Sequence, residues 1–190
     1  MTEVDNALLE RFEREVWSKV PHLEEKDGET KVVNATPLVD ITEDFKECAK
    51  TVFKLNLDDV DLKVFGKFDS TLLTGSIKVR PAANIIHDAI VTGKLRSGQT
   101  VIEATSGNFG IALGLLSKLE LNVIALVSRK LQEGVFEELR NGNIRTMDLD
   151  MDICPAPGME GKQNLMVAKA TAANVRSQLS NFGFDTDIFD

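Results

Sequence analysis

Residues 100–116 read TVIEATSGNFGIALGLL and place a β-branched stretch, a Ser-Gly-Asn turn and an apolar helical stretch in direct succession. Residues 100–104 predict a short strand, and the apolar residues that follow Gly110 predict a helix. A turn of this kind directs backbone N–H groups toward the carboxyl end of the strand, where open α/β sheets usually bind ligands. Taken alone, the turn is more commonly explained as an ordinary capped helix start.

Strands and helices keep alternating around this stretch. We expect strands at 63–68, 100–104, 122–127 and 143–149, and helices after Lys78, at 110–119 and at 133–140. Strands that alternate with helices over short connections indicate βαβ units and a parallel sheet. The predicted fold class is α/β, with a three-layer parallel sheet of βαβ units.

A second stretch, residues 74–82, reads TGSIKVRPA and presents one lysine between a glycine turn and a helix start. Gly75 permits a tight turn, Ser76 is a suitable N-cap, and Pro81 is tolerated only in the first turn of a helix. Lys78 is therefore expected at a helix N-terminus, whose partial positive charge favours the neutral amine that a Schiff base requires. The alternative is a lysine that simply points into water.

The two stretches together, Gly-Ser-Ile-Lys-x-Arg-Pro-Ala and then Thr-Ser-Gly-Asn, resemble the cysteine synthase family of pyridoxal-phosphate enzymes, known as fold type II. The resemblance covers roughly residues 34–150 and begins at the segment 35–39, ATPLV. It implies the N-terminal portion of that fold, pyridoxal 5'-phosphate as cofactor and an amino-acid substrate such as an O-activated serine. It also implies β-replacement or β-elimination as the reaction and a homodimer as the complete enzyme.

The resemblance assigns roles to individual residues. Lys78 matches the lysine that holds the cofactor as a Schiff base and later moves the α-proton of the substrate. Asn108 matches the asparagine that hydrogen-bonds the phenolic oxygen of the cofactor, and Thr105 begins the loop that grips the substrate carboxylate. The substrate-binding residues predicted in this way are Thr105, Ser106, Gly107, Asn108 and Phe109.

The sequence departs from the family pattern at three places. Residues 72–76 read LLTGS where the family usually has Asn-Pro-Thr-Gly-Ser, and Val79 replaces a frequent aspartate. Phe109 stands where cysteine synthases usually have a threonine. Schiff-base chemistry tolerates that change more readily than sulfide-specific synthesis, so the acceptor substrate stays open.

In the family, the glycine-rich loop for the cofactor phosphate and the residue facing the pyridine nitrogen come from later sequence. We find neither here, so the chain corresponds to about the first half of a family enzyme. We expect residues 1–44 to form an N-terminal helix and initial segment of the larger domain, 45–150 a small α/β domain, and 151–190 a loop and helix leading into a C-terminal part. Two alternatives stay open: a partial α/β domain that needs a second chain and lacks catalysis, and a generic nucleotide-binding domain. The second lacks the glycine-rich or phosphate-loop motifs that would support it.

Composition excludes several function classes. A formal net charge of −8 disfavours nucleic acid and anionic membrane surfaces, which basic proteins bind. No apolar run reaches the length of a membrane span, and the polar N-terminus favours a cytoplasmic location. Cys48, Cys154, His22 and His87 form no metal-ligand spacing, so we expect no metal and no disulfide.

The remaining segments carry weaker signals. We expect an amphipathic helix at 5–20, a solvated connection at 21–31 and a strand at 31–34. Helices are also expected at 42–53, with Thr42 as the cap, and at 164–181. An irregular loop at 153–161 contains Cys154.

Overall fold

The computed structural model describes residues 3–105, 107–128 and 130–149, the strand 186–188, and the helical positions 170, 173, 174 and 177. Ser106 and the predicted loop 153–161 with Cys154 lie outside the described residues. Most of the predicted helix at 164–181 also lies outside them.

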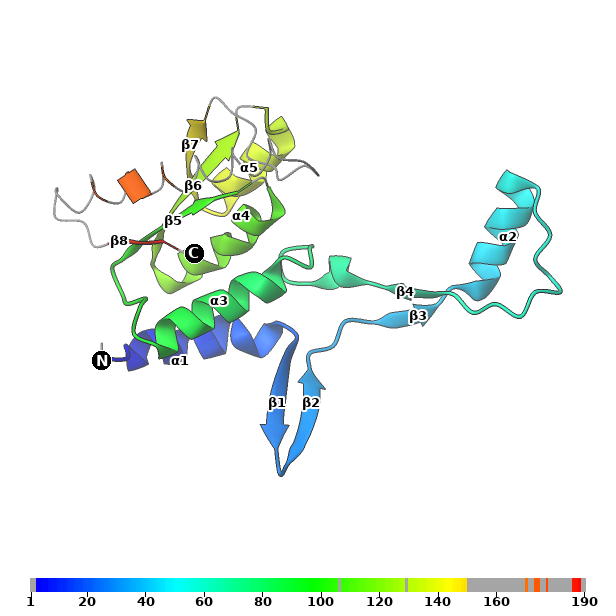
Figure 1. Cartoon of the computed structure of the whole chain (residues 1–190), viewed down its shortest axis with the longest axis horizontal. Helices are drawn as coiled ribbons and strands as arrows, with labels where there is room; N and C mark the ends of the chain where they lie inside the picture. Colours follow the sequence, from blue (N-terminus) through cyan, green and yellow to red (C-terminus); the bar gives the residue numbers. More distant parts are fainter. Residues whose placement is uncertain are drawn as a thin grey trace.

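The centre of the molecule is a four-stranded parallel sheet (Figure 1). Its strands, in the order β7-β6-β5-β8, are β7 (Arg145–Leu149), β6 (Asn122–Ser128), β5 (Thr100–Ala104) and β8 (Thr186–Ile188). Helix α4 (Asn108–Leu113) continues as the 3-10 helix η3 (Gly114–Leu119) and connects β5 to β6, and α5 (Glu133–Asn141) connects β6 to β7. The predicted α/β fold with a parallel sheet of βαβ units is therefore confirmed.

The direction in which the strands are added reverses at β5. The chain proceeds from β5 to β6 and β7 on one side, whereas β8, the last strand in sequence, pairs with the other side of β5. Such a reversal separates the connections that leave the carboxyl ends of adjacent strands and opens a crevice there. The turn that follows β5 is thus the expected ligand-binding position of this sheet.

Helices cover one face of the sheet as a connected layer. Crossovers between parallel strands are right-handed, so α4 and α5, which advance in the same direction, lie on the same face. Helix α3 (Val79–Val91) packs against α4, and α1 (Asn6–Glu15) packs against α3 and η3. Fully buried side chains from this layer form the core with the facing strand residues, among them Phe12, Ile86, Ile90, Leu113, Leu116, Val101 and Ala125. Burying each large apolar side chain contributes about 1.5–3 kcal/mol, so this layer fixes α3 and α4 relative to the sheet.

The sheet is apolar on its other face as well. Ile102 and Leu126 are fully buried, and they alternate along their strands with Val101 and Ala125 of the helix-covered face. Strands that bury both faces are typical of parallel sheets covered on two sides. This agrees with the predicted three-layer arrangement.

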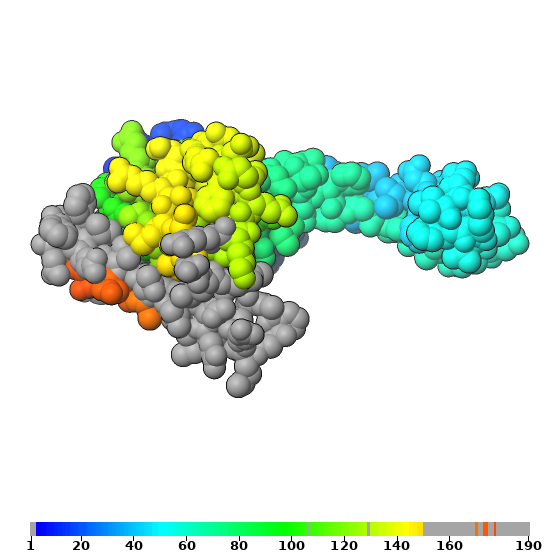
Figure 2. Space-filling view, turned by 90° about the horizontal axis from the view of Figure 1, so that it is seen from above, coloured from blue at the N-terminus to red at the C-terminus, as the bar shows by residue number. Residues whose placement is uncertain are grey.

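Residues 38–67 form an arm that projects from this body (Figures 1 and 2). It consists of β3 (Leu38–Asp40), helix α2 (Thr42–Phe53) and β4 (Phe65–Lys67), and β3 pairs with β4 in an antiparallel ribbon. The prediction of a strand near 63–68 is confirmed, but its placement in the parallel sheet is wrong. A short apolar run shows that a strand exists, yet its pairing partner is decided by contacts with distant residues.

A β-hairpin occupies the segment that we predicted as a solvated connection. Strand β1 (His22–Lys26) pairs with β2 (Glu29–Val33), and the turn residues Asp27 and Gly28 both have positive φ, 56° and 79°. Two left-handed residues between antiparallel strands form a type I′ turn, for which Asp-Gly is a favoured sequence. The prediction for 21–31 was therefore wrong.

Candidate functional site

The turn between β5 and α4 is shaped by two glycines. Gly107 has φ of +144°, a conformation that side chains with a Cβ rarely adopt. A Cβ on Gly110 would lie 2.5 Å from Cγ2 of Thr105, so only glycine permits this closeness. The glycines therefore let the first turn of α4 lie directly against the end of β5.

Thr105 caps this helix from inside the turn. Its side chain is buried, and its Oγ1 accepts hydrogen bonds from the N–H of Gly110 at 2.9 Å and of Gly107 at 3.4 Å. The N–H of Ile111 is bonded to the Gly107 carbonyl at 3.0 Å. Among the described residues, the N–H groups of Asn108 and Phe109 have no acceptor, which leaves two donors that can serve an anionic ligand.

The side chains of Asn108 and Phe109 differ in environment. Asn108 is the first residue of α4 and is exposed, so its amide can reach a bound molecule. Phe109 is half-buried and packs against the apolar core. The Phe109 ring therefore packs against the core and also lies next to the β5–α4 turn.

Lys78 immediately precedes the first residue of α3, as the sequence predicted. Gly75 takes the left-handed conformation with φ of 65°, and Ser76 Oγ accepts the N–H of Lys78 at 3.2 Å. The side chain of Lys78 is exposed, and among the described residues its amine makes no hydrogen bond or ion pair. It is thus available for reaction with a bound molecule.

Lys78 and the β5–α4 turn lie at the same end of the sheet. A short connection, residues 92–99, joins the last residue of α3 to the start of β5, so α3 runs antiparallel to β5 and begins near its carboxyl end. Helix α4 also begins there, and α3 packs against α4 (Figure 1). The two stretches singled out in the sequence therefore open neighbouring helices at the switch point.

A polar network next to Lys78 was not predicted. Nη2 of Arg80 donates to Asp69 Oδ1 at 2.5 Å and to Thr36 Oγ1 at 3.2 Å, and Thr36 Oγ1 donates to Asp69 Oδ1 at 2.6 Å. Lys67 Nζ donates to the carbonyl of Thr36. The segment 35–39 and Arg80 both belong to the stretches that carry the family resemblance, but no local pattern shows that Thr36, Asp69 and Arg80 meet.

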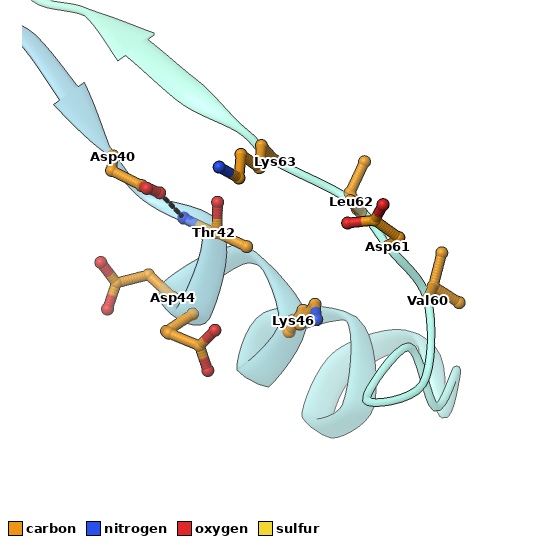
Figure 3. Close-up of a pocket in the computed structure, with 9 residues that line it drawn as sticks. Asp40, Thr42, Asp44, Lys46, Val60, Asp61, Leu62 and Lys63 are labelled. Atoms are coloured by element: carbon orange, nitrogen blue, oxygen red, sulfur yellow. Dashed lines mark hydrogen bonds between the residues drawn. The ribbon is translucent and has the colours of Figure 1, made fainter.

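A surface hollow on the arm does not suit the same ligand (Figure 3). It lies between α2 and residues 60–63, and its lining includes the carboxylates of Asp40, Glu43, Asp44 and Asp61 and the amines of Lys46 and Lys63. The Thr42 side chain and N–H beside Asp40 hold the pKa of that carboxyl below its ordinary value, so it stays ionised. The excess of negative charge disfavours a phosphate or a substrate carboxylate.

The described part of the chain has neither a cluster of metal-ligating side chains nor a helix that could span a membrane. Histidine, cysteine and carboxylate side chains form no group there that could hold a metal ion. None of the helices described has the length and apolar character needed to cross a membrane.

Comparison with known proteins places the chain among enzymes of one cofactor class. The family described as "Pyridoxal-phosphate dependent enzyme" matches residues 32–176. A cysteine synthase of Aquifex aeolicus is 35% identical over 98 residues, which are 50% of this chain and 27% of that protein. An O-ureido-L-serine synthase of Streptomyces lavendulae is 43% identical over 54 residues, 28% of this chain and 17% of that protein.

The fold has solved counterparts as well. A crystal structure of O-ureido-L-serine synthase superposes with a TM-score of 0.54 and 21% identity, over 80% of this chain and 40% of that one. This likeness shows the shared fold. The chain thus spans well under half the length of the relatives that it matches.

Proposed function

The chain belongs to the pyridoxal-phosphate-dependent enzyme family, and from that membership we propose that it forms the lysine-bearing part of an enzyme of the cysteine synthase type. The proposed reaction is β-replacement or β-elimination on an amino acid such as an O-activated serine. One observation carries the proposal: Lys78 and the β5–α4 turn open neighbouring helices at the switch point of the sheet.

The residues present fit pyridoxal phosphate in part. The exposed amine of Lys78 can attach the aldehyde of the cofactor, and the exposed amide of Asn108 can hydrogen-bond its ring oxygen. When bound, the cofactor supplies an electron sink for the α-carbon of the substrate. We expect the residues that grip its phosphate to come from sequence outside this chain.

Each residue of the site has a task in this proposal. Lys78 Nζ holds the cofactor and then moves the α-proton of the substrate. The N–H groups of Asn108 and Phe109, which have no acceptor among the described residues, lie at the positive end of α4 and orient the substrate carboxylate together with Thr105, Ser106 and Gly107. Buried Thr105 contributes mainly by holding the turn, since its Oγ1 already accepts the Gly110 N–H.

Trapping the cofactor on the chain tests this proposal. The purified chain is incubated with excess pyridoxal phosphate, reduced with borohydride and mapped by peptide mass spectrometry. We expect Lys78 to carry most of the label, and Lys78→Ala to abolish the visible absorbance of the adduct. Lys130→Ala, which removes an exposed lysine from another turn, is the control and should change neither result.

Two outcomes would overturn the assignment: a label spread over many surface lysines, or an unchanged absorbance in Lys78→Ala. Binding of pyridoxal phosphate by this chain alone should be weak and reversible. Without the residues that bind the cofactor phosphate, several charge-assisted hydrogen bonds are missing. Appreciable turnover is therefore expected only from the complete enzyme.

A homodimer and a cytoplasmic location complete the proposal. Cys48 is an exposed free thiol, and such thiols persist in reducing compartments. The exposed apolar side chains of the arm support the dimer, because they could be buried between two copies of the chain.

A further inference from the structure

We propose that Arg80 is a positioning residue for Lys78. Its ion pair with Asp69, shared with the Thr36 hydroxyl, closes the loop 69–80 at its base and holds the start of α3 in place. The inference rests on the proposed function, because Arg80 can position a reactive lysine only if Lys78 is that lysine.

The network joins three segments that are distant in sequence. Thr36 precedes the arm, Asp69 follows it, and Arg80 lies in the first turn of α3. Thr36 is buried, and the side chains of Asp69 and Arg80 are exposed by only 19% and 35%. A pair that is shielded to this degree from water and salt is more persistent than the exposed ion pairs elsewhere on the molecule.

The loop that this pair closes contains the reactive lysine. Lys78 lies two residues before Arg80. Its N–H donates to Ser76 Oγ at 3.2 Å, and its carbonyl accepts the N–H of Ala82, beyond the loop, at 3.1 Å. Gly75, with positive φ, makes the middle of the loop intrinsically adaptable. Buried Leu72 and Val79 anchor the loop in the core, and the ion pair adds a polar contact that joins its two ends directly.

Arg80 reaches both partners through the terminal nitrogen Nη2 of its long side chain. One guanidinium nitrogen bridges a carboxylate and a hydroxyl, and the planar group is oriented by both. A lysine keeps the charge but is shorter and carries it as a single point on a flexible stem, so we expect it to hold Asp69 and Thr36 less firmly. Arg80→Lys thus separates the charge of the residue from its geometry.

The test measures the loop and the lysine separately. Hydrogen exchange of the amides at 70–78 is compared between wild type and Arg80→Lys without cofactor, and the rate of borohydride-trapped labelling at Lys78 is compared with cofactor. We expect faster exchange in this loop and labelling that is roughly ten- to a hundredfold slower, as misplacement of a reacting group predicts. Arg140→Lys, which alters the exposed ion pair with Glu133 at 3.1 Å, is the matched control and should change neither measurement.

A milder variant covers the case in which Arg80→Lys fails to fold. Thr36→Val removes one hydroxyl, and it should give an intermediate increase in exchange at 70–78 and an intermediate loss of labelling. Both folded variants could have a lower melting temperature and yet show wild-type exchange and labelling rates at temperatures where they are folded. In that case Arg80 is structural and the inference is wrong. If wild type itself is not labelled at Lys78, the proposed function fails, whereas the exchange data still decide whether the pair holds the loop.

Discussion

At the scale of single residues, the contact between Gly110 and Thr105 fixes how close α4 approaches β5. Gly110→Ala would place a Cβ 2.5 Å from Thr105 Cγ2 and 3.2 Å from Leu139 Cδ2. Since overpacking of this kind costs about 1–3 kcal/mol, we expect Gly110→Ala to lower the free energy of unfolding by that amount. Urea denaturation followed by circular dichroism measures it.

Gly134 supplies the matched control for this substitution. It lies within helix α5, and a Cβ there would meet no atom within 4 Å. Gly134→Ala should therefore stabilise the chain by about 0.5–1 kcal/mol through helix propensity alone. Two substitutions with the same sign would refute the close approach at Gly110.

Phe109 offers a second residue-scale prediction, which concerns specificity. In the complete enzyme, Phe109→Thr should shift the preference toward small O-activated serines, because a hydroxyl replaces an apolar ring beside the substrate loop. Phe109→Val has nearly the same shape as the threonine variant but no hydroxyl, so it separates polarity from lost packing against the core. Relative kcat/KM values across a series of substrates provide the measurement. If the two variants give the same substrate order, the hydroxyl has no part in specificity.

The residue scale also shows what the sequence could predict of the site. The turn at Gly75 and the position of Lys78 at a helix start follow from local rules and agree with the structure, whereas the prediction of Ser76 as N-cap was wrong, because Lys78 itself is the N-cap. The Arg80–Thr36 contact joins residues 44 positions apart, and nothing in either neighbourhood indicates the other. Contacts of that kind depend on the tertiary fold.

At the scale of elements, Asp5 attaches helix α1 to the body. Its Oδ1 accepts the N–H of Leu8 at 3.0 Å as an N-cap, and its Oδ2 accepts the N–H of Ser97, in the connection before β5, at 2.9 Å. The Ser97 hydrogen bonds, followed by that of Leu8, hold the pKa of Asp5 below its ordinary value. A carboxyl whose pKa is lower in the folded state stabilises the fold above its unfolded pKa and loses that effect as the pH falls through the folded value.

Asp5→Ala should accordingly destabilise the chain by about 1 kcal/mol at pH 7, with a difference from wild type that shrinks below about pH 4. Asp5→Asn retains an acceptor for the cap but lacks the second carboxylate oxygen for Ser97 and cannot titrate. It should lose less stability than alanine at pH 7. Thermal melts of the three proteins between pH 3 and 7 test this, and a constant difference between wild type and alanine would contradict the role of the charge.

Among the elements, those with a repeating pattern were predicted well. The strand at 100–104 matches β5, and the helix predicted at 133–140 is one residue shorter than α5. The strand predicted at 31–34 overlaps the end of β2, but β1 and the turn of the hairpin were missed. Both strands are rich in charged residues and expose most side chains, so they lack the buried alternation that usually indicates a strand. Its Asp-Gly turn was the available signal.

At the scale of the whole molecule, the arm is the feature that composition and periodicity could not show. The helix at 42–53 and the strand at 63–68 were predicted and β3 was not, and the projection of the arm from the body follows from the pairing of β3 with β4. The arm carries many large apolar side chains that are exposed, among them Leu38, Phe45, Val52, Phe53, Leu55, Val60 and Phe65. Exposed apolar surface of this extent is typical of an interface.

We therefore expect the purified chain to self-associate through the arm. Val52 and Phe53 lie at the end of α2 and are 64% and 67% exposed, so Val52→Thr with Phe53→Ser removes apolar surface without changing the net charge. Burial of one large apolar side chain contributes about 1.5–3 kcal/mol, so the double variant should weaken association at least about tenfold. Light scattering over a range of protein concentrations measures the change.

Leu23→Ser is the control, because Leu23 is 66% exposed but belongs to the β1–β2 hairpin, and it should leave association as in wild type. A wild-type chain that stays monomeric, or an equal effect of the hairpin variant, would show that the arm is not the surface through which copies of the chain associate.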